Sequence, residues 1–195
     1  RLTASYSYGR VKVVDGPSED FDVKGHSQYL SLRLDHPLYV TSTSKLTGYL
    51  QAARQTSETE MFNVLTVSDT SVKSLTAGLE QLWLKEGMTL YANGQYIESW
   101  LKDYTFDNAS RYRRLTGYLT WDHRLWKNWG YTVNAGAQRY LGGGEMASGD
   151  SFYLGTSSGV RGYENDTISA YNGAWINLEA KYHLDGKGSN VFAFL

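Results

Sequence analysis

The 195-residue sequence contains no cysteine, only two prolines and no long uninterrupted apolar run. Without cysteine, the chain forms no disulfide and offers no thiolate ligand to a metal. No segment approaches the roughly eighteen consecutive apolar residues of a transmembrane helix. The formal net charge of −1 argues against a partner bound through phosphate electrostatics, such as a nucleic acid. These absences exclude a disulfide-stapled domain, a helical membrane protein and a basic nucleic-acid binder.

Tyrosine, tryptophan and glycine are abundant instead, with 16, 6 and 20 copies respectively. A membrane β-barrel uses aromatic side chains at its interfaces and glycines where its sheet curves. It tolerates few prolines, because each proline removes a hydrogen-bond donor from the sheet. The composition is therefore typical of a barrel of β-strands.

Alternation of apolar and polar residues is the strongest pattern in the chain. In the segment 174–184, Ala174, Ile176 and Leu178 share one face, while Trp175 and Asn177 share the other. The segments 28–38, 115–125 and 131–141 alternate in the same way, whereas 88–103 alternates poorly and is placed by its neighbours. The pattern predicts nine strands, at about 2–13, 27–38, 44–55, 71–84, 88–103, 112–126, 130–141, 173–184 and 190–195.

The connections between these segments alternate between short and long. Short turns are expected at 39–43, 85–87, 127–129 and 185–189, and long polar connections at 14–26, 56–70, 104–111 and 142–172. Outer-membrane barrels have short periplasmic turns and longer outer loops. Near the short turns lie Tyr39, Trp83, Trp126 and Trp129, which either form an interfacial girdle or are ordinary core aromatics.

These patterns predict an all-β protein, a transmembrane antiparallel β-barrel located in the bacterial outer membrane. A closed single-chain bacterial barrel has an even number of strands, so nine strands cannot close alone. We expect residues 1–195 to be part of a single barrel domain, a fragment whose remaining strands lie before Arg1, after Leu195 or both.

The connection 142–172 is the longest in the chain, and a loop of this length in a compact domain is usually functional or disordered. It contains Val160-Arg161-Gly162-Tyr163, in which a glycine on each side of the Val160-Arg161 pair permits a tight tip. If the loop folds into the lumen, Arg161 requires an acidic partner on the inner wall. Candidates are Glu179, Asp122 and Asp35; the alternative is a solvated arginine in an outer loop.

The Val160-Arg161-Gly162-Tyr163 tip, followed by a strand with Asn177-Leu178-Glu179, resembles the signature of the outer-membrane assembly and two-partner secretion superfamily. The stretch Leu30-Ser31-Leu32-Arg33-Leu34 with His36-Pro37-Leu38-Tyr39 is similar to the strand-and-turn pattern of the two-partner secretion translocators (TpsB type, relatives of haemolysin and filamentous-haemagglutinin secretion proteins). The order of the strands is similar over most of the chain, but only the arginine tip and the strand after it are specific to this superfamily.

The resemblance implies a barrel of sixteen strands preceded by two periplasmic POTRA domains that are not in this chain. The chain would supply the fifth to thirteenth strands, and the loop 142–172 would fold into the lumen. The acidic partner in the family normally lies in the strand after the one that carries Glu179, in a phenylalanine-x-aspartate-x-glycine pattern. Here that strand reads Val191-Phe192-Ala193-Phe194-Leu195, and the aspartate is not within the sequence given, so Glu179 is the one partner of Arg161 that can be named within it.

The predicted function is secretion of an unfolded exoprotein through the lumen, without a nucleotide. We expect the passenger and the outer-membrane lipid to be partners, and no nucleic acid. Residues expected to face the lumen are Tyr118, Thr120, Asp122, Arg124, Asn177, Glu179 and Lys181. No nucleophile–base pair, metal-ligand spacing or phosphate loop stands out, so no enzyme activity, metal or cofactor is expected.

Three other functions remain open at this point. A barrel-assembly insertase of the same superfamily would share the arginine tip, but its passenger would itself be a barrel strand. A passive solute porin would show the same alternating strands without needing that tip. A soluble β-sandwich binding module would bury the apolar faces against a second sheet.

Overall fold

Neighbouring strands of the chain pair in sequence order to form one large antiparallel sheet. The computed structural model describes residues 1–13, 22–62, 64–125, 128–154, 168–183 and 190–194. Nine strands follow the order β1-β2-β3-β4-β5-β6-β7-β10-β11, and β8 and β9 form a separate two-stranded ribbon. Their bounds are β1 Leu2–Lys12, β2 Lys24–Val40, β3 Ser44–Met61, β4 Leu65–Lys85, β5 Met88–Asp103, β6 Asn108–Arg124, β7 Trp129–Gly143, β8 Phe152–Leu154, β9 Ile168–Ala170, β10 Gly173–His183 and β11 Asn190–Phe194. The predicted all-β, antiparallel class is confirmed.

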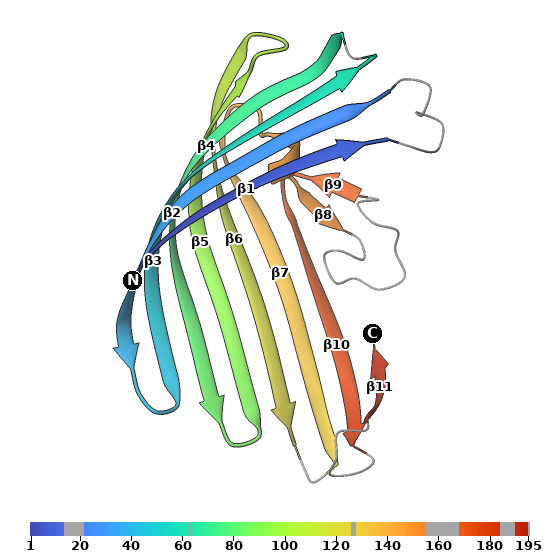
Figure 1. Ribbon diagram of the computed structural model, residues 1–195. Coiled ribbons are helices and arrows are strands. Elements are labelled where there is room, and N and C mark those ends of the chain that lie inside the picture. The colour runs from blue at the N-terminus through green and yellow to red at the C-terminus, as the bar shows by residue number, and fades with distance from the viewer. Residues whose placement is uncertain (14–21, 63, 126–127, 155–167, 184–189, 195) are drawn as a thin grey trace.

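The large sheet curves into an open half-barrel (Figure 1). We call the end at which β7 leads into the connection to β10 the long-loop end, and the connections 62–64 and 104–107 lie at the same end. The connection between β2 and β3 is 41–43, and the one between β4 and β5 is 86–87. No helix in the described part of the chain is long and apolar enough to span a membrane.

The two faces of the sheet differ in chemistry because successive side chains point to opposite sides. On one face, Arg33 of β2 reaches Glu80 of β4 across β3, with Nη2 and Oε1 2.7 Å apart. Tyr49 of β3 likewise reaches Gln95 of β5 across β4. Side chains on alternate strands, roughly 9–10 Å apart, meet most readily on a concave surface, so this polar face is the inner one.

The convex face carries the apolar residues, and they are open to the surroundings. Leu30, Leu50, Leu75 and Ile176 are 55%, 60%, 53% and 60% exposed. No second sheet covers them among the described residues, so a β-sandwich does not describe this chain. A soluble monomer rarely exposes an apolar surface of this extent, whereas a barrel presents it to lipid.

The structure corrects the expected connections at the long-loop end. Most of the predicted connection 56–70 is strand, because β3 continues to Met61 and β4 begins at Leu65. Likewise β6 begins at Asn108 rather than near residue 112. Both faces of these extensions are largely polar, so the alternation disappears although the hydrogen-bonded ladder continues. The short strands β8 and β9 within 142–172 were not predicted either.

Candidate functional site

A charged cluster lies on the inner face of β2–β4. The guanidinium of Arg33 contacts Asp35 through Nε at 2.8 Å and Glu80 through Nη2 at 2.7 Å. The same guanidinium lies over the ring of Tyr49, 3.8 Å from its centroid. One cation is thus shared by two carboxylates and an aromatic face, which fixes its position on the wall.

Neutral side chains continue this cluster around the curve. The Tyr49 hydroxyl donates to Gln95 Oε1 at 2.6 Å and accepts from Asn93 Nδ2 at 3.1 Å. Gln95 Nε2 in turn donates to Thr116 Oγ1 at 2.9 Å on β6. Next to the Arg33 cluster, the inner wall is therefore lined with neutral amide and hydroxyl side chains.

The predicted lumen residues of β6 lie on this face, two residues apart along the strand. The register pairs Thr120 with Asn134 of β7 and Asp122 with Thr132. Thr120 Oγ1 lies 2.9 Å from both Tyr118 Oη and Asn134 Oδ1. Arg124 ends β6 at the short-turn side and is exposed.

The predicted residues of β10 meet those of β6 across β7. Lys181 Nζ lies 2.9 Å from Asp122 Oδ2, which also accepts a hydrogen bond from Thr132 Oγ1 at 2.6 Å. Asn177 is in register with Asn134 of β7. The structure therefore brings Asp122 and Lys181 into contact, although no sequence argument paired them.

The four-residue arginine signature, Val160, Arg161, Gly162 and Tyr163, lies outside the described residues. Its expected partner Glu179 is described, in register with Thr132 of β7 and Phe194 of β11. The two other candidate acids have partners of their own, since Asp35 binds Arg33 and Asp122 binds Lys181. The pairing of Arg161 with Glu179 therefore stays a prediction from the sequence.

The start of the long connection is held on the inner wall by Asp150. Arg114 Nη2 lies 2.6 Å from Asp150 Oδ1, and Arg114 Nη1 donates to the Asp150 carbonyl oxygen at 2.6 Å. The Tyr112 hydroxyl donates to the other carboxylate oxygen, and Gln138 Nε2 donates to the same carbonyl at 3.0 Å. We name Tyr112, Arg114, Gln138 and Asp150 the loop anchor.

Burial and local structure explain why the anchor is firm. Tyr112 has no exposed surface and Met146, from the connection, is 4% exposed. A short 3₁₀ turn, Ser148–Asp150, presents the aspartate toward the wall. The far end of the connection is also held, because the Tyr140 backbone N–H donates to Asn172 Oδ1 at 2.7 Å. The β8–β9 ribbon lies in the hollow of the curve near β10 (Figure 1).

The sequence predicts the position of one member of the loop anchor, Arg114, but not that of Asp150. Arg114 lies within the predicted strand 112–126 and continues the polar alternation of Thr116 and Tyr118, so the same pattern places it on the inner face. Asp150 lies in an irregular segment with no period, and its partners are more than ten residues away. Only a three-dimensional structure identifies that contact.

A curved antiparallel sheet with a polar inner wall, an apolar outer face and a connection folded inward defines an outer-membrane β-barrel. Residues 1–194 match the model of the family described as haemolysin secretion/activation protein ShlB/FhaC/HecB. The chain belongs to this family, which places it among the two-partner secretion translocators of the outer membrane.

Individual relatives are consistent with that assignment. The sequence is 26% identical over 180 residues to the heme/hemopexin transporter protein HuxB of Haemophilus influenzae, covering 87% of this chain and 32% of that protein. The fold matches CdiB from Acinetobacter baumannii with a TM-score of 0.76 and 18% identity, covering 99% of this chain and 36% of the other. CdiB from Escherichia coli matches with a TM-score of 0.73 and 17% identity, covering 95% and 36%. The chain spans about a third of the length of these relatives.

Proposed function

We propose that the protein to which this chain belongs secretes an unfolded exoprotein through the barrel lumen, without a nucleotide. Support comes from the family and from the chemistry of the inner wall. Hydroxyls and amides such as Thr120 and Asn134 bind water and peptide groups equally well, so a sliding chain exchanges one for the other at little cost.

Mixed charge on the wall suits the same task. Arg33 lies between two carboxylates, and Asp122 lies beside Lys181, so neither sign dominates. Asp122 is 52% exposed, and an ion pair that is open to solvent contributes about 0–1 kcal/mol, little enough for the Asp122–Lys181 pair to open and re-form as a chain passes. A wall with charges of only one sign would bind a passenger of the opposite charge tightly and hold it in the lumen.

The observation that carries the proposal is the loop anchor. Asp150 binds Arg114 and thereby holds the start of the connection, residues 144–154, against the inner wall. From this base, the arginine tip extends into the lumen and binds Glu179 of β10. The anchored connection then keeps the lumen closed at rest, and release of the tip accompanies transport.

The test replaces Arg161 by alanine in the full-length protein and measures exoprotein secretion and barrel assembly separately. We expect secretion to fall while the heat-modifiable, folded barrel still reaches the outer membrane. Arg139→Ala is the matched control, because Arg139 is exposed and lies on the outward face of β7. Normal secretion by the Arg161→Ala protein would refute the latch.

Two further measurements separate the rival functions. A porin conducts ions freely with its loop intact, whereas a closed translocator shows low resting conductance that rises when Arg161 is replaced. An insertase would speed the assembly of other barrels, so depletion of this protein would lower their abundance. Loss of one exoprotein with other barrels unchanged supports secretion.

A further inference from the structure

Basic side chains gather on the outward face of β3–β6, near the end with the long connections. The ladder places Arg54 opposite Lys73, Lys73 opposite Trp100, and Trp100 opposite Arg111. Outward-facing neighbours extend the group by one row on each side. We name this the outer basic patch, and it consists of Arg54, Lys73, Lys102, Arg111 and Arg113.

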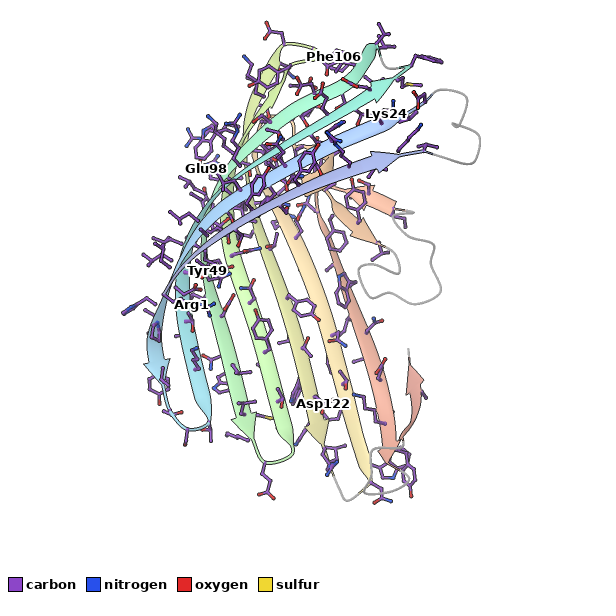
Figure 2. All side chains as sticks on the ribbon, viewed as in Figure 1. Arg1, Lys24, Tyr49, Glu98, Phe106 and Asp122 are labelled. Carbon is purple, nitrogen blue, oxygen red and sulfur yellow. The ribbon has the colours of Figure 1, made fainter. Side chains whose placement is uncertain are left out.

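Acidic side chains do not balance this charge. Glu98 contacts Arg111 Nε at 2.8 Å, and Asp107 lies 4.0 Å from Lys102 Nζ. Among the described residues, no carboxylate lies within ion-pair distance of Arg54, Lys73 or Arg113. Glu58 and Asp69 lie four residues farther out along β3 and β4. Figure 2 shows Glu98 among side chains on the convex side of the sheet.

The pairing of Arg54 with Lys73 is unfavourable in isolation. Like charges directly opposite one another on neighbouring strands repel, and here both side chains are exposed on the face that meets lipid. A barrel pays up to about 2–4 kcal/mol for Arg or Lys at the bilayer midplane but almost nothing at an interface. The outer basic patch is therefore stable only if it lies at the membrane–water interface or if a bound anion neutralises its charge.

Its depth can be estimated along β4. Trp83 lies on the outward face at the short-turn end, and Lys73 is ten residues away on the same face. At about 3.3 Å per residue and a tilt of about 40°, ten residues rise roughly 25 Å, the height of the apolar band of such barrels. Lys73 thus lies where the headgroups of the outer leaflet begin.

The surface at the outer basic patch also contains a hollow and, next to it, a groove. A hollow of about 460 Å³ is lined by Arg54, Lys73, Trp100 and Arg111. Below it, toward the short turns, lies an apolar groove of about 680 Å³, to which Leu50, Leu79 and Leu115 contribute. Gly48 and Gly94 have no side chain to fill that groove. The cationic hollow and the apolar groove follow each other along the same strands.

We propose that this surface binds a phosphorylated glycolipid of the outer leaflet, a lipopolysaccharide, with its phosphates on the outer basic patch and acyl chains in the groove. Arginine offers a planar fork that matches phosphate oxygens, and Lys73 supplies a point charge between Arg54 and Arg111. A bound phosphate would neutralise the facing like charges. The indole of Trp100 lies at headgroup depth, where aromatic rings are favoured.

The experiment measures binding of purified lipopolysaccharide to the delipidated full-length protein by native mass spectrometry in detergent. The test variant carries Arg54→Ser, Lys73→Ser and Arg111→Ser. The control variant carries Lys45→Ser, Lys85→Ser and Arg124→Ser, an equal loss of charge among exposed residues near the short turns. We expect affinity to fall at least about tenfold in the test variant alone, because charge-assisted contacts are lost.

A second arm uses only the unaltered protein, so it does not depend on how the variants fold. It compares lipid A with the same lipid A after removal of both phosphates, and with phosphatidylglycerol as an anionic phospholipid. Stronger binding of phosphorylated lipid A than of the other two lipids supports the proposal. Equal binding of all three lipids, or an affinity unchanged in the triple patch variant, would overturn it.

Discussion

The ring of Tyr49 on β3 occupies the space above Gly78 on β4, its partner in the ladder. A Cβ built on Gly78 would lie 2.3 Å from Cζ of that ring. The missing side chain lets the tyrosine lie flat against the inner wall. In this position the ring lies beneath the Arg33 guanidinium in a cation–π contact, and the hydroxyl donates a hydrogen bond to Gln95.

Gly78→Ala should therefore destabilise the barrel, by about 1–3 kcal/mol as for other overpacked sites. The Tyr49 ring would be displaced, and its contacts with Arg33 and Gln95 would be lost with it. The measurement is the urea midpoint of the folded, heat-modifiable form in detergent. Gly94→Ala is the control, because nothing lies within 4 Å of a Cβ there. Equal midpoints for the two variants would contradict the packing described.

A second glycine pair tests backbone conformation at the inward bend of the long connection. Gly142 and Gly143 follow a register shift opposite Arg113 and Arg114, with φ values of +100° and +116°. A Cβ on Gly143 would lie 2.2 Å from the Arg111 carbonyl oxygen, whereas a Cβ on Gly142 has open space. Both alanine variants suffer left-handed strain of about 1–3 kcal/mol.

Only Gly143→Ala adds a backbone clash, so it should lower the unfolding midpoint further than Gly142→Ala and impair loop placement. Limited proteolysis of the 144–154 segment measures that placement. Cleavage should become faster in the Gly143→Ala protein than in the Gly142→Ala protein. Similar cleavage rates would show that the bend tolerates a shift of the β6 backbone.

The sheet was predictable because its main signal is local. Alternation has a period of two residues, so a segment such as 174–184 shows its apolar face without knowledge of its partners. The outer ends of β3 and β4 escaped prediction because both faces meet water there, and only backbone pairing defines them. The contact of Asp150 with Arg114 depends on the path of an aperiodic segment, which no local rule describes.

The Asp122–Lys181 pair should couple only weakly if the inner wall offers exchangeable contacts. The two side chains are 52% and 28% exposed, so solvent screens their attraction. A double-mutant cycle with Asp122→Asn and Lys181→Met should give a coupling energy of about 0.2–1 kcal/mol. A coupling above about 2 kcal/mol, the size expected of a desolvated pair, would argue that this part of the wall is a fixed structural bridge.

The loop anchor should behave differently, since the side chains of Arg114 and Asp150 are only 15% and 22% exposed. Asp150→Asn keeps the size of the side chain but removes the charge that Arg114 faces. Hydrogen bonds to charged groups contribute about 1.5–3 kcal/mol, so the connection should leave the wall in a measurable fraction of molecules. We expect higher single-channel conductance in planar bilayers.

Reversing the pair separates this electrostatic role from a general loss of packing. Arg114→Asp alone places two acids together and should raise conductance most, because repulsion is added to the lost attraction. Combining it with Asp150→Arg restores opposite charges and should return conductance toward that of the unaltered protein. Conductance that stays high in the reversed pair would assign the closed state to the Tyr112 hydroxyl, whose hydrogen bond to the Asp150 carboxylate the swap also removes, whereas Gln138 donates to the Asp150 backbone carbonyl. Tyr112→Phe distinguishes that outcome, since it deletes one hydroxyl and leaves the ion pair in place.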